Sequence, residues 1–307
     1  MPSNLPTNGV SVRTYAPPPA SIDFSKCSDK RRAVYGVPPR SRAFRAVEKR
    51  WLARARKLRI VRATFETRER KRKRSPELGA AHRSQNTKTW SGGVVYPPRG
   101  GRIRWVEGSW TVPQVSAPAR AKTKIWYTAS CWVGIDGDGS SCDVLQAGCD
   151  CDVRVSKRGS QQQCNLWWEW FPAGSSWIRS IKISPGDVMA CLICVPGESD
   201  ISASIFLANL TKRVGCIFSV TAPEGILLHG NCAEWIVEAL DTNDGKPALA
   251  NYTPVVFSHC NAGVIRGTAA KTKSVGSGKC INIVNSRGKI VSKGKKLTRT
   301  KLRVSYV

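Results

Sequence analysis

From about Trp90 onward, the chain is a succession of short segments rich in Val, Ile, Trp, Thr and Tyr, separated by clusters of Gly, Pro, Asp and Ser. No stretch of helical periodicity interrupts this part. Short β-type segments with recurring turn signals predict an antiparallel sandwich or barrel. The clearest segments are residues 109–112, 125–132, 144–148, 167–171, 188–195, 203–208, 216–220 and 233–240.

The residues before Trp90 have a different character. Residues 1–40 are rich in Pro, Ser and charge, which predicts disorder. Over residues 41–74, apolar side chains recur at three- and four-residue steps on a basic background, which predicts an amphipathic helix. We therefore expect a basic leader, residues 1–88, followed by a β domain, residues 89–307. The leader could be a pro-segment cut near Arg74, a nuclear-localisation or nucleic-acid patch, or a solvated helix without a role.

Charge is distributed unevenly along the chain, whose net charge is +28. The leader has 23 basic against 6 acidic residues, and residues 251–307 have 12 basic and no acidic residue. Residues 131–250 are acidic, with 8 basic against 14 acidic residues, and we expect the chemistry to lie in that acidic centre. The basic arms support one alternative, a non-catalytic β-sandwich protein that binds an anionic polymer.

The cysteines and the hydropathy pattern limit other functions. Twelve Cys are present, and the close pair Cys191 and Cys194 falls in an apolar strand, where the two side chains would point to opposite faces and suit no metal. We expect core thiols or disulfide partners, no metal and no cofactor. No apolar run is long enough to span a membrane, and Pro17, Pro18 and Pro19 lie where a signal peptide would need its apolar core.

Three segments carry candidate site residues. In residues 233–238, strand alternation puts Glu234 and Glu238 on one face, which either lines a wet cleft or is simply exposed. Gln146 lies on the opposite face from Leu145. Glu169 is surrounded by Trp residues, so its carboxyl group must be paired or have a raised pKa.

Other hydrolytic schemes have little support in the sequence. The chain has three His, without a His-Glu-x-x-His motif, a Gly-x-Ser-x-Gly elbow, or the paired Asp-Thr-Gly or Asp-Ser-Gly turns of an aspartic protease. A zinc hydrolase or a Ser/His enzyme is therefore not expected.

Taken in order, the segments resemble the eqolisin family of glutamic peptidases over about residues 90–307. The resemblance implies a sandwich of two antiparallel sheets, concanavalin-like or jelly-roll-like, with substrate held on a concave face. The segments that carry it are Thr89-Trp90-Ser91-Gly92-Gly93, Gly108-Ser109-Trp110-Thr111-Val112-Pro113, Trp132-Val133-Gly134-Ile135-Asp136-Gly137, Leu145-Gln146-Ala147-Gly148, Trp168-Glu169-Trp170-Phe171-Pro172, Gly186-Asp187, Asn209-Leu210-Thr211 and Ala233-Glu234-Trp235-Ile236-Val237-Glu238.

The resemblance also implies roles for individual residues. Gln146 matches the catalytic glutamine and Glu238 the catalytic glutamate, with Glu234 as the alternative base. Together they would hold one water from neighbouring strands, so that the Glu is the base and the Gln amide stabilises the oxyanion. The residues expected to line the substrate cleft are Glu169, Asp136, Trp132, Trp168 and Glu234.

Further expectations follow from this kinship. The protein would be a monomeric, acid-acting endopeptidase that cleaves proteins or peptides outside the cell, with no membrane and no nucleic acid as partner. Cys142 and Cys232 lie near positions that some members join by a disulfide. A basic leader laid across the acidic cleft would keep the enzyme silent at neutral pH. A peptidase that has lost its activity is a second alternative, against which the presence of both Gln146 and Glu238 argues.

Overall fold

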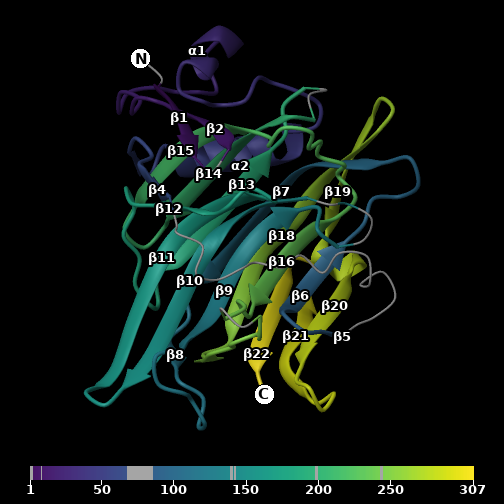
Figure 1. Ribbon diagram of the computed structural model, residues 1–307. Helices are drawn as coiled ribbons and strands as arrows, with labels where there is room; N and C mark the ends of the chain where they lie inside the picture. Colours follow the sequence, from purple (N-terminus) through teal and green to yellow (C-terminus); the bar gives the residue numbers. More distant parts are fainter. Residues whose placement is uncertain are drawn as a thin grey trace.

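Two antiparallel β-sheets stack face to face to form the protein (Figure 1). The computed structural model describes residues 3–7, 9–67, 86–138, 141, 143–197, 200–242 and 245–307. The all-β sandwich that the sequence predicts is confirmed. Among the described residues, no helix is long and apolar enough to cross a lipid bilayer.

We call the first sheet the front sheet. Each of its neighbouring strands pairs in antiparallel register. Its strands, in spatial order, are β12 (Ser176–Ile178), β11 (Gly159–Phe171), β10 (Val144–Ser156), β9 (Trp126–Ile135), β16 (Ala233–Glu238) and β6 (Trp90–Val95).

We call the second sheet the back sheet, and its neighbouring strands are also antiparallel. Its strands, in spatial order, are β15 (Val214–Thr221), β14 (Ser202–Asn209), β13 (Val188–Cys194), β7 (Arg102–Thr111), β18 (Val255–Arg266) and β19 (Ala269–Ser274).

The basic C-terminal region joins the two sheets along one edge. Strand β20 (Lys279–Val284) pairs with β6 of the front sheet, and β22 (Lys301–Tyr306) pairs with β18 of the back sheet. Between them, β21 (Ile290–Thr298) pairs with both, so these strands form a continuous connection from one sheet to the other (Figure 1, yellow). The short elements nearby are β5 (Asn86–Thr87), η1 (Val275–Ser277), and the isolated pair β8 (Val115–Ser116) and β17 (Asn251–Tyr252).

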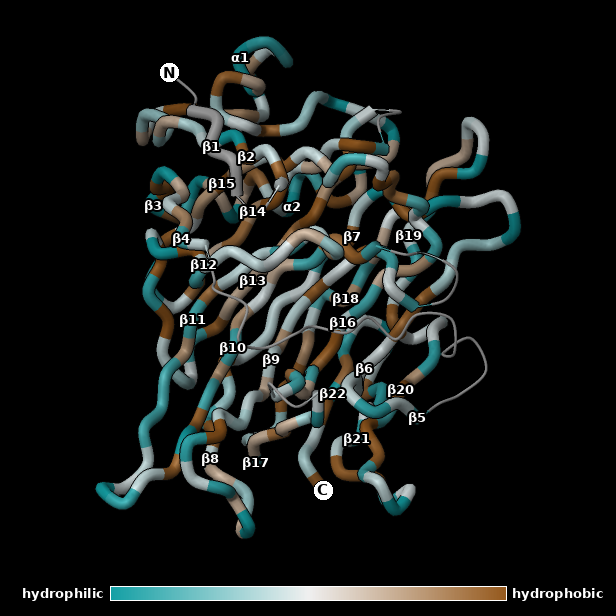
Figure 2. Tube along the Cα trace, viewed as in Figure 1, coloured by the Kyte–Doolittle hydropathy of each residue, from teal (hydrophilic) through white to brown (hydrophobic). Residues whose placement is uncertain are grey.

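The main hydrophobic core lies between the sheets and follows strand alternation. Cys191 belongs to this core, whereas Cys194, three residues further along β13, packs in a separate cluster on the outer side of the back sheet. The expected opposite orientation of these two thiols is thus confirmed. Figure 2 shows hydrophobic positions in the strands and a hydrophilic tip on the long β10–β11 hairpin.

The N-terminal segment differs from its prediction. Residues 1–40 were expected to be disordered, yet strands β1 (Ser3–Thr7) and β2 (Val10–Thr14) form a hairpin that extends the back sheet beside β15, followed by α1 (Asp29–Ala33). The helix expected over 41–74 is only α2 (Arg45–Ala55). After it, β3 (Arg59–Ile60) pairs with β15, and β4 (Phe65–Thr67) pairs with β12 of the front sheet. Free edge strands offer unpaired backbone groups, which explains why a polar segment gains order there. Residues 68–74 lie outside the described part.

Helix α2 packs on the outer face of the back sheet. Its buried residues Val47, Trp51 and Ala55 are the apolar stripe that the sequence predicts, and they join a cluster with back-sheet residues such as Leu192 and Phe206. The Trp51 and Phe206 rings meet edge to face with centroids 4.9 Å apart. This contact fixes the helix on the side of the sandwich opposite to the front sheet's outer face.

A buried charge strengthens the same contact. Glu107 of β7 is 0% exposed and forms an ion pair with Arg50 of α2. Trp51 Nε1 donates to Glu107 Oε2 at 2.7 Å, and Asn261 Nδ2 donates to Oε1 at 3.0 Å. The hypothesis of a leader laid across the acidic cleft is therefore wrong for residues 9–60, which cover the back sheet instead.

Candidate active site

The outer face of the front sheet, turned away from the sandwich core, gathers most of the candidate residues. Val133, Ala147 and Trp235 point into the core. Because side chains alternate along a strand, their neighbours Gly134, Gln146 and Glu234 face the other way.

Four neighbouring strands align these residues and Glu169 in one row. Gln146 of β10 lies directly opposite Gly134 of β9 on one side and Glu169 of β11 on the other. Glu234 of β16 also lies directly opposite Gly134. Neighbouring strands are about 4.8 Å apart, so the Cα atoms of Glu234 and Gln146 are separated by roughly 10 Å across a glycine.

The row leaves two polar atoms without partners. Gln146 Nε2 donates to Glu169 Oε2 at 3.1 Å. Within the described part of the chain, Gln146 Oε1 and Glu234 Oε2 are buried and have no hydrogen-bond partner. A Cβ atom at Gly134 would lie 3.3 Å from the Cβ of Gln146 and 2.9 Å from the Trp132 ring, so a glycine is needed for these two side chains to sit as they do.

The surroundings of Glu234 favour its neutral form. Burial raises the pKa of Glu234 well above its ordinary value, and the negative charge of Asp138 raises this pKa further. The Cys232 thiol donates to Glu234 Oε1 at 3.3 Å, which opposes the rise in pKa. Asp138 in turn accepts a hydrogen bond from the Tyr96 hydroxyl.

Glu238 lies in a different row of the same face. Its register partner on β9 is Ser130, four residues from Gly134, which corresponds to about 13 Å along the strand. Trp132 Nε1 donates to Glu238 Oε2 at 2.9 Å, and the Trp132 ring packs edge to face on Trp90. The expectation that Gln146 and Glu238 meet from neighbouring strands needs correction, because β9 separates β10 from β16.

Asp136 lies at the end of β9, where the backbone turns with φ 68°. Its carboxylate accepts three backbone N–H bonds, from His229 and Gly230 at 2.8 Å and from Asn231 at 2.5 Å. Burial raises the pKa of Asp136, although these three donors act in the opposite direction. Asp136 therefore ties the loop before β16 to the end of β9.

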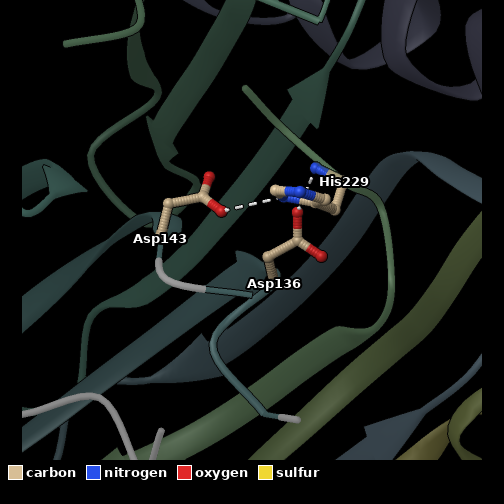
Figure 3. A group of neighbouring side chains, drawn as sticks. All are labelled: Asp136, Asp143 and His229. Carbon is tan, nitrogen blue, oxygen red and sulfur yellow. Dashed lines mark hydrogen bonds and ion pairs between the residues drawn. The ribbon is translucent and has the colours of Figure 1, made fainter. Parts of the chain in front are cut away.

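Asp143 and His229 lie beside Asp136 (Figure 3). His229 Nδ1 is 3.6 Å from Asp143 Oδ1, and Trp170 Nε1 donates to Asp143 Oδ2 at 3.0 Å. Burial raises the pKa of Asp143 to about 6, with the charge of Asp136 as the second cause. One ligand atom from each of Asp136, Asp143 and His229 lies within 4.8 Å of the others, so these three side chains could hold a cation.

Trp168 does not line the same face as Gln146. It lies in the core between the sheets, in contact with the rings of Phe65 and Phe218. Strand alternation predicts this position, because consecutive residues point to opposite faces and Trp168 directly precedes Glu169. Its neighbour Trp167 is the one that shares the outer face, in a cluster with Trp90 and Trp132.

Sequence reasoning missed the surroundings of Glu234, because it treated Cys232 only as a disulfide candidate and singled out neither Tyr96 nor Asp138. Cys232 precedes the β16 strand by one position, and its thiol donates to Glu234 rather than to another sulfur. Cys142, its expected disulfide partner, lies outside the described residues. Tyr96 and Asp138 come from loops, so no strand period could have indicated them, whereas Gly134 was visible as a glycine inside an apolar strand.

The outer face of the front sheet thus gathers an amide and buried carboxyl groups of raised pKa, which marks it as a candidate catalytic site on a β-sandwich. A sequence model of the Peptidase A4 family matches residues 88–306, and the chain belongs to this family. It is therefore a peptide-bond hydrolase, with proteins or peptides as substrates.

Individual relatives agree with this membership. The chain is 32% identical over 202 residues to aspergillopepsin-2 of Aspergillus niger, which covers 61% of this chain and 68% of that protein. It is 30% identical over 181 residues to scytalidopepsin B of Scytalidium lignicola, which covers 56% of this chain and 62% of that protein. A solved structure of scytalido-glutamic peptidase with a transition state analog inhibitor has a similar fold, with a TM-score of 0.56, 24% identity, and coverage of 72% of this chain and 98% of that chain.

Proposed function

We propose that the protein is an acid-acting glutamic endopeptidase in which Glu234 is the general base and Gln146 stabilises the oxyanion. One observation carries the proposal. Glu234 and Gln146 flank Gly134 in a single row, and each has a buried oxygen atom that finds no hydrogen-bond partner among the residues the structure describes. Buried polar atoms are rarely left unpaired, and a water molecule above Gly134 would satisfy both.

The geometry supports a simple sequence of proton transfers. Ionised Glu234 takes a proton from the water as its oxygen attacks the scissile carbonyl carbon. The Gln146 amide donates an N–H to the developing oxyanion. Protonated Glu234 then passes its proton to the leaving amine, which completes cleavage and restores the carboxylate.

Glu169 acts through Gln146. The hydrogen bond between the Gln146 amide and the Glu169 carboxyl fixes the plane of that amide. We therefore propose Glu169 as a positioning residue. We propose that three further residues shape the substrate-binding face. Trp132 and Glu238 lie further along the same face of the front sheet and share a hydrogen bond, and Asp136 lies at the end of β9.

The pKa of the base bears on the working pH. A general base must be ionised, and burial raises the pKa of Glu234. Activity would therefore rise with pH through a value above that of an ordinary glutamate. The pH at which activity appears would therefore be higher than for an enzyme whose base is an exposed glutamate.

Three substitutions test this assignment. In Glu234→Gln we expect kcat on an acid-denatured protein substrate to fall by about 10²–10⁴-fold, because the base is lost. In Gln146→Ala we expect a fall of about 10²–10³-fold, because an oxyanion donor is lost. Glu238→Gln is the comparison on the same strand: as a residue of the binding face it should raise KM, but kcat should stay within a few-fold of the wild type because the base is kept. If Glu238→Gln is inactive and Glu234→Gln is active, the base is Glu238 and the proposal fails.

The N-terminal segment is proposed to be a permanent part of the enzyme, at least over residues 9–67, rather than a pro-segment. Its strands extend both sheets, and Arg50 of its helix α2 forms an ion pair with the buried Glu107. Cleavage near Arg74 would leave this segment bound. An extracellular location and a monomeric state remain predictions from kinship.

A further inference from the structure

Four cysteines form a line across the front sheet. Cys131 of β9 lies directly opposite Cys149 of β10, and Cys151 of β10 lies directly opposite Cys164 of β11. The line runs from the buried core outwards, since Cys131, Cys149 and Cys151 are 0% exposed and Cys164 is only partly buried. All four are thiols in this structure.

The outer pair is in direct contact. The Cys164 thiol donates to Cys151 Sγ, and the two sulfur atoms are 2.9 Å apart. Directly opposed residues in antiparallel strands have Cα atoms about 4.5–5.5 Å apart, which falls within the range of about 4.4–6.8 Å that a disulfide spans. The strands therefore hold these two side chains where a bond can form without moving the backbone far.

Most of the other buried cysteines have thiols that resist oxidation. Burial raises the pKa of the Cys191, Cys194, Cys216 and Cys260 thiols, which keeps them protonated and unreactive. Cys164 differs because solvent reaches it while its sulfur contacts a second thiol. Cys27 and Cys280 are partly exposed as well, but Cys164 combines access to solvent with a second thiol in contact, so an oxidant that reaches it can form a bond within the pair.

We propose that Cys151 and Cys164 form a cross-strand disulfide in the mature enzyme, made by exchange with a low-molecular-weight disulfide. The Cys164 thiolate attacks one sulfur of the small disulfide, whose S–S bond breaks and releases one small thiol. Burial raises the pKa of the Cys151 thiol too, so its sulfur attacks Cys164 Sγ in the mixed disulfide as its proton passes to the departing small thiolate, which leaves as the second small thiol. The small disulfide takes up the two electrons, and the two protein thiol protons end on the released thiols.

The bond would lock the register on which the candidate site depends. Gln146 pairs with Glu169 five residues along the same two strands. A slip of one residue between β10 and β11 would turn every side chain of one strand to the other face, and Glu169 would lose Gln146. A covalent link at Cys151 and Cys164 excludes that slip.

The test uses the full chain, first reduced and then incubated with oxidised glutathione. We expect the number of free thiols to fall by two and a tryptic fragment containing Cys164 to become linked to the fragment that ends at Arg154. That fragment holds Cys131, Cys142, Cys149 and Cys151 together, so variants must assign the bond. Cys149→Ser should keep the link, and Cys151→Ser should lose it.

Stability gives an independent measurement. Cys164→Ser changes a partly buried side chain, so it should fold. In oxidising buffer its Tm should lie on the order of 5 °C below that of the wild type, and in reducing buffer the difference should nearly vanish. The proposal is overturned if Cys164 stays a free thiol or a mixed disulfide with glutathione in the wild type. It is equally overturned if the link survives in Cys151→Ser. Neither result depends on peptidase activity.

Discussion

Glu234 and Gln146 lie in one row of the front sheet, each directly opposite Gly134 on the strand between them. The glycine has no side chain of its own on the middle strand, so a larger residue there would press on the Gln146 side chain and the Trp132 ring. We assign Glu234 and Gln146 as the catalytic pair because of this arrangement.

A methyl group at Gly134 should impair catalysis without unfolding the protein. In Gly134→Ala the added methyl group would lie 3.3 Å from the Gln146 Cβ and 2.9 Å from the Trp132 ring. A small displacement of catalytic groups typically lowers the rate strongly, so we expect kcat to fall by about 10–100-fold, together with a moderate fall in Tm because the buried Trp132 ring must shift. Gly215→Ala is the matched control, since it meets the Ala208 Cβ at 3.3 Å in the back sheet. Equal losses of activity in both variants would contradict the role of Gly134.

Asp138 should control the acid limb of the pH profile. Its negative charge disfavours ionisation of Glu234 and so raises the pKa of that residue. In Asp138→Asn the pKa of Glu234 should fall, and kcat/KM should therefore rise at a lower pH than in the wild type. The profile of kcat/KM against pH on a peptide substrate measures the shift. The control Asp23→Asn, in the N-terminal segment, should leave the apparent pKa of the acid limb unchanged. A higher apparent pKa in Asp138→Asn than in the wild type would contradict the proposed effect of the Asp138 charge.

Asp143 should make the fold more stable in acid. Its pKa is about 6 in the folded protein, raised by burial and then by Asp136, against an ordinary value of 3.8. A carboxyl group with a raised folded pKa contributes its full stability below pH 3.8, and that contribution is lost as pH rises through 6. The difference is at most about 3 kcal/mol.

Asp143→Asn removes this titration while keeping an acceptor for Trp170. The quantity to compare is the unfolding free energy of the variant minus that of the wild type. This difference should be larger at pH 7 than at pH 3.5, by up to about 3 kcal/mol, because the wild type loses the contribution of Asp143 as pH rises. Urea denaturation at the two pH values gives both differences. An unchanged difference across the pH range would show that Asp143 titrates normally.

Trp51 should matter for stability and not for activation. It packs on Phe206 and donates to the buried carboxylate of Glu107. Trp51→Ala should lower the free energy of unfolding by about 3–5 kcal/mol. Leu52→Ala, which changes the next residue on the same helix at a half-buried position, should cost clearly less. If the N-terminal segment were a removable inhibitor, Trp51→Ala would instead raise acid proteolysis with little loss of stability.

Strand alternation made the front sheet largely predictable. The segments at 125–132, 144–148 and 233–240 correspond to β9, β10 and β16, and Gln146, Glu234 and Glu238 share the expected outer face. The same alternation separates Trp168 from Glu169, so its place in the core could have been foreseen.

The two-residue period of the sequence was enough to indicate an all-β chain and which side chains share a strand face, because that period acts locally. It left a sandwich and a barrel open, and the resemblance to the eqolisins favoured the sandwich. Only the tertiary structure decided that Glu234, rather than Glu238, stands level with Gln146. Both glutamates have the same parity, and the choice between them depends on register across a third strand, which many contacts distant in sequence set together. The N-terminal segment's position on the back sheet has the same origin, since a basic amphipathic helix carries no local sign of the surface it will cover.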